Sequence, residues 1–159
     1  MQRRELTVFV DYHQFYLWDA GSSPQAPEDF DAADIAARVK VAPHVVVVQP
    51  VRNDEVPVSF ELHERDPGVD PAAFDHLVEC SLALPTGQLQ LHEVMGGAVL
   101  ELRVPPGSYR VRVGFAGLAR AGDDHPSLAR AGDDRYAVVM WPAEQGPLQV
   151  IRRFAEAPA

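Results

Sequence analysis

Cysteine is almost absent from this chain of 159 residues: Cys80 stands alone, so no internal disulfide can form. It lies in the alternating run Val78 to Leu82, where a thiol serves as a small buried hydrophobic group. Long apolar stretches are missing as well, because runs such as Val45 to Val48 are far shorter than a membrane span. We therefore expect a cytoplasmic protein with no membrane contact.

Positive charge is also scarce, with 14 Lys and Arg against 23 Asp and Glu, a net charge of -9. The whole excess lies in residues 1–80, which hold 15 acidic and 6 basic side chains, whereas residues 81–159 hold 8 of each. Such a surface repels nucleic-acid phosphates and attracts cationic proteins. The charge disfavours nucleic-acid binding. The alternative explanation is that the charge only keeps the protein soluble.

The sequence lacks the usual catalytic and metal-binding motifs. It contains no His-x-His, no His-Glu-x-x-His, no Gly-x-Ser-x-Gly elbow and no glycine-rich phosphate cradle. A metal enzyme would need His63, His76 or His92 to converge in space, and we expect His63 and His92 to be outward-facing strand residues. The prediction is a protein with no catalytic residues, no metal and no cofactor.

Apolar and polar residues alternate in short runs, which is the pattern of strands with one buried face. Val56, Val58 and Phe60 form one such row, while Pro57 and Ser59 lie on the other face. The segments between runs are short and rich in proline, glycine and acidic residues, as in antiparallel hairpins. We expect eight or nine strands, within residues 6–18, 45–51, 56–63, 78–84, 88–94, 100–104, 109–115, 136–141 and 148–154.

One short helix is expected over Phe30 to Val39, with Asp31 or Asp34 as its N-cap. Strands with one wet face each need a second layer, so two sheets must pack face to face. Strict alternation disfavours a parallel α/β fold, whose strands are apolar on both faces. The predicted fold class is all-β, an antiparallel β-sandwich forming a single domain over residues 1–159, with a closed barrel as the alternative.

A short repeat occurs late in the chain, where the sequence Leu-Ala-Arg-Ala-Gly-Asp-Asp of residues 118–124 recurs as residues 128–134. The spacing is far below a solenoid period, so duplication inside one loop explains it. We expect residues 117–134 to form an exposed, mobile loop. Its Gly-Asp-Asp segments are predicted to be acidic turns rather than a calcium site.

The densest aromatic cluster of the sequence lies between residues 12 and 18. In a regular strand, Tyr12, Tyr16 and Trp18 would share one face, and Phe15 and Leu17 would take the other. Both faces are then apolar, as in a central strand. We expect core packing to account for most of this cluster.

Five segments spread along nearly the whole chain carry a resemblance to a known family. They are Glu5 to Val8, Tyr12-His13-Gln14-Phe15, Gln49 to Asn53, Leu102 to Tyr109, and Asp134-Arg135-Tyr136. In this order they resemble the competence protein J family of small bacterial proteins, whose founding member inhibits the DNA-entry nuclease. The specific motif is Tyr12 to Phe15. The resemblance implies a β fold and an inhibitory contact with a protein, but it assigns no inhibitory residues.

Charge and resemblance together favour a non-catalytic protein that binds and restrains a cationic protein partner, such as a nuclease or toxin. The candidate contact residues are the acidic side chains expected on loops and edges: Asp54, Glu55, Asp66, Asp70, Asp123, Asp124, Asp133 and Asp134. The alternative is a β-sandwich module that binds a small molecule or carbohydrate through Tyr16, Trp18 or Trp141. The sequence leaves the oligomeric state open.

Overall fold

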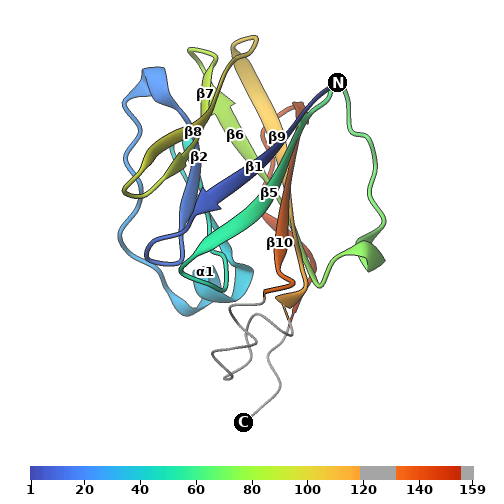
Figure 1. The fold of residues 1–159 in the computed structure, drawn as a ribbon. Coiled ribbons are helices and arrows are strands. Elements are labelled where there is room, and N and C mark those ends of the chain that lie inside the picture. Colours follow the sequence, from blue (N-terminus) through green and yellow to red (C-terminus); the bar gives the residue numbers. More distant parts are fainter. Residues whose placement is uncertain (119–131, 155–159) are drawn as a thin grey trace.

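Two β-sheets pack face to face in the computed structural model, which describes residues 1–118 and 132–154 (Figure 1). The six-stranded sheet has the order β1-β5-β10-β9-β6-β11, and the five-stranded sheet has the order β3-β4-β2-β7-β8. The first sheet comprises β1 (Gln2–Phe9), β5 (Glu55–Leu62), β10 (Arg135–Pro142), β9 (Gly107–Ala116), β6 (His76–Leu84) and β11 (Gln149–Arg152). The second comprises β3 (Val39–Ala42), β4 (Val45–Val48), β2 (Phe15–Asp19), β7 (Gln88–Glu93) and β8 (Gly97–Arg103).

The predicted all-β sandwich is confirmed, with two differences in detail. The described residues form eleven strands, because residues 6–18 divide between β1 and β2 and because β3 precedes β4. All neighbouring strands are antiparallel except β10 and β5, which run parallel with Tyr136 opposite Val58. That pair joins distant parts of the chain, so no hairpin pattern in the sequence predicts it.

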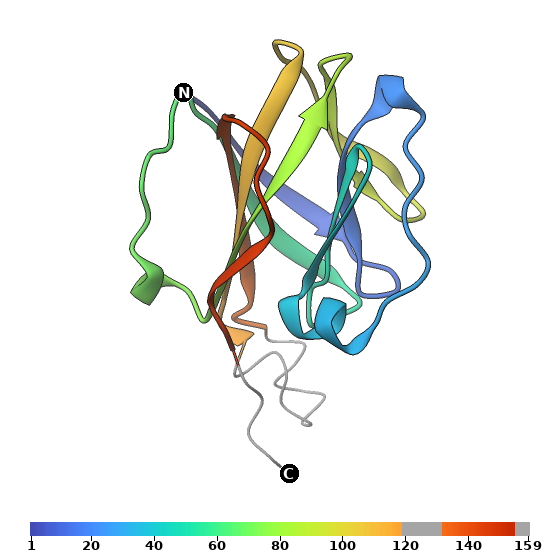
Figure 2. The same ribbon diagram turned by 180° about the vertical axis from the view of Figure 1, so that it is seen from behind.

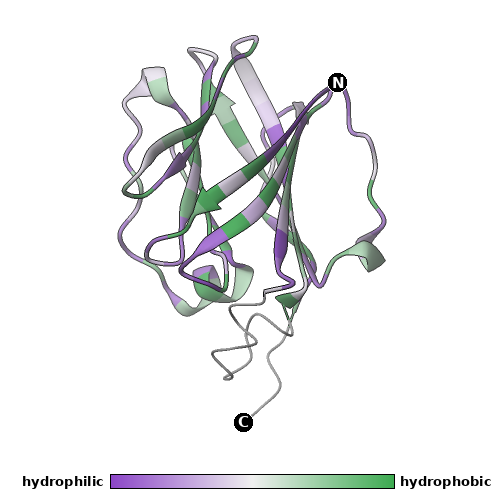
Figure 3. Ribbon diagram, in the orientation of Figure 1, coloured by the Kyte–Doolittle hydropathy of each residue, from purple (hydrophilic) through white to green (hydrophobic). Residues whose placement is uncertain are grey.

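The core lies between the sheets and consists of the inward-facing row of each strand. Val56, Val58 and Phe60 of β5 are fully buried, as their alternation predicts. The hydropathy colours of β1 and β5 change along their length for the same reason (Figure 3). Cys80 is also fully buried, and burial raises the pKa of its thiol to about 12. The thiol therefore acts as the predicted small core residue.

The outer face of the five-stranded sheet is covered by residues 23–31, which run along it from the short η1 (Ala20–Ser22) towards α1 (Ala32–Ala37; Figure 2). Phe30 packs there against a small cluster that contains Tyr16, Val45 and Val47. This cover explains why Val45 to Val48 is apolar without alternation, since both faces of β4 are buried.

The helix α1 is shorter than the predicted span of residues 30–39. Asp31 caps it: the Asp31 carboxylate accepts from the Asp34 N–H (2.8 Å), and the Asp34 carboxylate accepts from the Asp31 N–H (3.0 Å). It ends at Arg38, whose φ of 62° is left-handed. Within the residues described, no helix is long and apolar enough to cross a membrane.

The outer face of the six-stranded sheet is partly covered by residues 63–75, which include the short helix η2 (Pro71–Ala73). The Phe74 ring lies so close to Gly114 that a Cβ there would come within 2.5 Å of it. Arg112 lies below this segment, with its guanidinium 4.5 Å from the centre of the Trp141 ring. Trp141 is consequently buried.

Candidate protein-binding site

The chain passes from one sheet to the other through residues 10–14, between the end of β1 and the start of β2 (Figure 1). The Gln14 N–H donates to the Asp11 carbonyl (3.1 Å), and the two residues between them, Tyr12 and His13, have φ values of 56° and 53°. A turn with two left-handed central residues normally uses Asn-Gly. Bulky residues pay about 1–2 kcal/mol each for this conformation, so the turn is strained.

A second loop, residues 49–54, holds this strained turn in place. The His13 N–H donates to Asn53 Oδ1 (2.7 Å), and His13 Nδ1 lies 3.1 Å from the Pro50 carbonyl oxygen. The Val10 N–H donates to the Asp54 carbonyl (3.0 Å). These contacts come from residues about 40 positions along the chain, and they offset part of the local strain. We call residues 10–14 together with residues 49–55 the sheet-crossing corner.

A buried polar cluster supports the corner from below. Arg52 Nε donates to Asp134 Oδ1 (2.8 Å), and the Tyr136 hydroxyl donates to Asp134 Oδ2 (2.7 Å). The same hydroxyl accepts a hydrogen bond from the Val51 N–H (3.1 Å). Burial raises the pKa of Tyr136 strongly, and the negative charge of Asp134 raises it further. The phenol therefore remains a neutral donor that fixes the position of residues 49–54.

Three of the five segments that carry the family resemblance meet here: residues 12–15, 49–53 and 134–136. The sequence singled them out individually but gave no sign that they would be in contact. Arg52 and Asn53, which join them, were not among the predicted site residues. Their place in the segment Gln49 to Asn53, which carries the resemblance, was the available signal, and it does not identify a partner on its own.

The predicted acidic residues divide into groups. Asp54 and Glu55 are exposed in the sheet-crossing corner, and Asp133 is exposed at the same end of the sandwich. Asp134 was expected on an exposed loop, and that expectation is wrong: it is 1% exposed because Arg52 and Tyr136 bind its carboxylate. Leu118, at the other limit of that loop, is also buried.

The other predicted acidic residues lie away from the corner or outside the described residues. Asp66 and Asp70 belong to the segment over the six-stranded sheet. Burial favours a higher pKa for Asp66, but hydrogen bonds from the Gly68 N–H and the Arg112 guanidinium outweigh it and lower the pKa. Asp70 Oδ1 accepts from the N–H of Ala72 (3.0 Å) at the start of η2. Asp123 and Asp124, with most of the duplicated loop, lie outside the described residues.

The aromatic residues proposed for small-molecule binding are mostly engaged. Tyr16 is buried, and Trp18 stacks between the Tyr16 ring (5.3 Å) and His92 (4.6 Å). The Trp18 indole donates to Gln90 Oε1 (3.0 Å), and Gln90 in turn donates to Glu101 (2.8 Å). As predicted, Tyr16 and Trp18 share one face of a central strand, but Tyr12 is not in that strand.

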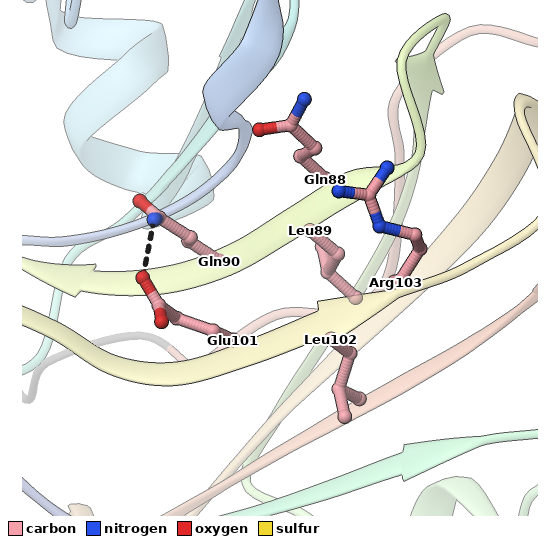
Figure 4. A pocket seen from close by; sticks show the side chains of 6 residues that line it. All are labelled: Gln88, Leu89, Gln90, Glu101, Leu102 and Arg103. Atoms are coloured by element: carbon pink, nitrogen blue, oxygen red, sulfur yellow. Dashed lines mark hydrogen bonds between the residues drawn. The ribbon is translucent and has the colours of Figure 1, made fainter.

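A shallow pocket lies beside Trp18 on β7 and β8 (Figure 4). Its volume is about 210 Å³, below the range of roughly 300–1,000 Å³ that is typical of ligand pockets. The side chains of Leu89 and Leu102 point away from the polar side chains of the pocket (Figure 4). Its lining residues are Gln88, Leu89, Gln90, Glu101, Leu102 and Arg103.

The histidines considered for a metal site lie in three separate environments. His63 Nε2 is 2.7 Å from Glu61, and His92 packs on Trp18. His76 is fully buried, where its ring contacts the Ala37 carbonyl (2.8 Å) and accepts the N–H of Phe154 (3.0 Å). Across residues 1–118 and 132–154, no three His, Cys, Asp or Glu side chains are grouped as metal ligands.

Two solved structures share this fold. One is ComJ from Bacillus subtilis, the inhibitor of the DNA-degrading activity of NucA, with a TM-score of 0.65 and 17% identity over 90% of this chain and 96% of that one. The other is described as crocagin biosynthetic gene J, with a TM-score of 0.54 and 22% identity over 89% and 96% of the two chains. The resemblance to competence protein J is thus confirmed at the level of the fold. No family model and no curated protein matches the chain.

Proposed function

We propose that this chain is a non-catalytic inhibitor that binds a cationic, DNA-degrading enzyme through the end of the sandwich that contains the sheet-crossing corner. The observation that carries the proposal is the position of Asp54, Glu55 and Asp133, which are exposed at that one end. The fold shared with the nuclease inhibitor ComJ supports the choice of partner class.

The charge distribution gives the proposal its physical basis. An enzyme that degrades DNA binds phosphates and therefore presents a positively charged cleft. A rigid body with a net charge of -9 is attracted to such a cleft, and complementary potentials accelerate the encounter. Carboxylates fixed on the rigid corner can occupy the cleft without the ordering cost of a flexible loop.

The carbohydrate or small-molecule alternative has less support. Trp141 is buried under Arg112, and the pocket beside Trp18 is small. Stacking of a sugar requires an accessible aromatic face, which Trp141 does not offer. We therefore put forward inhibition alone.

The proposal is tested by adding the purified protein to an extract of the cells that encode it and measuring the degradation of double-stranded plasmid DNA. We expect the added protein to suppress the degradation of the plasmid. The suppression should weaken between about 0.05 M and about 0.5 M NaCl because salt screens the charged contact. DNA degradation at an unchanged rate under both conditions would show that the proposal is wrong.

A charge-reversal pair locates the contact. Asp54→Lys combined with Glu55→Lys should weaken inhibition at least about tenfold. Glu144 is also exposed but follows β10 at the opposite end of that strand, so Glu144→Lys serves as the control for a simple change in net charge. Equal losses in the two proteins would mean that total charge, and not this end of the sandwich, governs binding.

A further inference from the structure

Three large apolar side chains are exposed around the sheet-crossing corner. Tyr12 in the turn is 71% exposed, Phe9 at the end of β1 is 44% exposed, and Met95 at the tip of the β7–β8 hairpin is 73% exposed. Isolated exposed apolar residues are normal, but these three come from two stretches of chain that lie side by side, so we treat them together as a candidate docking patch. We call Phe9, Tyr12 and Met95 the apolar patch.

A side-chain hydrogen bond and the pairing of β2 with β7 hold these segments together. The Phe9 N–H donates to Glu93 Oε2 (2.7 Å), and Glu93 lies two residues before Met95. In the five-stranded sheet, Phe15 is opposite Glu93, so the hairpin tip continues alongside the turn that precedes Phe15. Figure 1 shows the tip of the β7–β8 hairpin, the end of β1 and the turn on the same side of the molecule.

Folding alone does not account for Tyr12 at this position. Its ring is mostly in solvent, so it contributes little to the core, and its left-handed backbone would be more stable with Asn or Gly. Aromatic and methionine side chains that are exposed on a rigid backbone are typical anchors of protein interfaces. The local backbone cost and the exposed ring both indicate a contact outside this chain.

The charges around the apolar patch define the partner. Asp54 and Glu55 are exposed beside it, Asp11 is half-buried within the turn, and Arg52 is directed inwards to Asp134. A second copy related by a two-fold axis would bring these carboxylates close to their own equivalents, which is unfavourable. A positively charged protein surface with an apolar recess suits both the rings and the carboxylates.

We propose that Phe9, Tyr12 and Met95 are the anchor through which this chain docks on its partner, a cationic DNA-degrading enzyme, with Tyr12 inserted in an apolar recess of the enzyme's cleft. This inference rests on the proposed function and deepens it. The carboxylates steer the two proteins together, and the apolar patch determines how long they remain bound.

The decisive variant is Tyr12→Asn, because asparagine removes the ring but suits the left-handed backbone. We expect its melting temperature to equal or exceed that of the unmodified protein, while its inhibition of DNA degradation in the extract weakens at least about tenfold. Met95→Gln should weaken inhibition by a smaller factor. Ile151 is 41% exposed on β11, so Ile151→Asn is the matched control and should inhibit normally.

The outcomes separate this inference from the proposed function. An unmodified protein that fails to inhibit removes both. An unmodified protein that inhibits, with Tyr12→Asn equally potent, leaves the proposed function standing and overturns the anchor. Sedimentation of the unmodified protein as a dimer, with Tyr12→Asn monomeric, would assign the apolar patch to a second copy and would also overturn the inference. A selective loss of inhibition in a stable Tyr12→Asn monomer supports it.

Discussion

The two ends of the sandwich each bury a carboxylate, but different kinds of group bind the carboxylate at each end. At the end of β2, Asp19 is fully buried and accepts hydrogen bonds from neutral groups. These are Ser22 Oγ (2.6 Å), the Thr86 N–H (3.0 Å), Thr86 Oγ1 (2.5 Å) and the Gln88 N–H (3.1 Å). At the opposite end, Asp134 binds a cation, Arg52, together with the Tyr136 hydroxyl.

The groups that bind the two carboxylates also connect them to different parts of the molecule. The donors to Asp19 come from η1, the β6–β7 turn and the start of β7, and each of them is a neutral group. Arg52 also lies 3.7 Å from the exposed Asp54, so the buried pair at the other end extends to the surface. A charge that binds at the sheet-crossing corner can therefore act on the buried cluster through Arg52. The donors to Asp19, in contrast, are neutral groups.

The largest expected effect comes from removing the cation. Arg52→Met keeps much of the side-chain length but leaves the buried Asp134 carboxylate without its cation, which should lower the free energy of unfolding by about 3–5 kcal/mol. Urea denaturation measures this loss. Adding Asp134→Asn to Arg52→Met should recover part of it, because the uncompensated charge is gone. Strictly additive losses would show that the two side chains are not coupled.

A smaller loss is expected at the neutral end. Asp19→Asn replaces one carboxylate oxygen by an NH₂ group that faces donors, and it should lower the free energy of unfolding by about 2–3 kcal/mol. Burial alone would raise the pKa of Asp19, but hydrogen bonds from Ser22, Thr86 and Gln88 outweigh it and lower the pKa. The stabilisation from Asp19 is thus complete above its unfolded pKa of about 3.9 and is lost as the pH falls through the lower folded pKa.

The pH dependence checks the assignment. The stability difference between the unmodified protein and Asp19→Asn should be constant from about pH 7 to about pH 5 and should shrink only in more acid solution, below about pH 4. Urea titrations at each pH provide the measurement. A difference that instead grows as the pH falls would contradict a lowered pKa for Asp19.

The smallest effect is expected at the strained turn. Asn53→Ala removes the acceptor of the His13 N–H and should lower the free energy of unfolding by about 1 kcal/mol. Asn53→Asp keeps an acceptor at the same position and should retain most of the stability. Thermal melts of the two variants, compared with the unmodified protein, test the point, and equal melting temperatures for both would show that the turn does not depend on this contact.

The alternation in the sequence predicted much of the fold because each strand keeps one face in the core. Val56, Val58 and Phe60 are buried as expected, and so are Phe15 and Leu17. Residues 6–18 were wrongly taken as one strand, since the alternation continues through Tyr12 and His13, two residue types that rarely adopt the left-handed conformation observed there.

The candidate site was less predictable because its contacts join distant residues. Asp54 and Glu55 are exposed, as expected for a turn between strands. Asp134 was misplaced because its neutralising partner, Arg52, lies 82 positions earlier in the chain, and a single sequence contains no sign of that pairing. The family resemblance identified the correct segments, but only three-dimensional packing shows that they form one corner.

The position of β10 has a consequence for how the protein is made. Among the described strands of the six-stranded sheet, β10 alone joins the β1–β5 pair to the strands β9, β6 and β11. Before residues 135–142 have emerged from the ribosome, the nascent chain contains two separate fragments of this sheet. Each fragment has an open edge that could pair with other chains. Completion of the sandwich is thus a late step of biosynthesis, and a premature stop before β10 would release an aggregation-prone polypeptide.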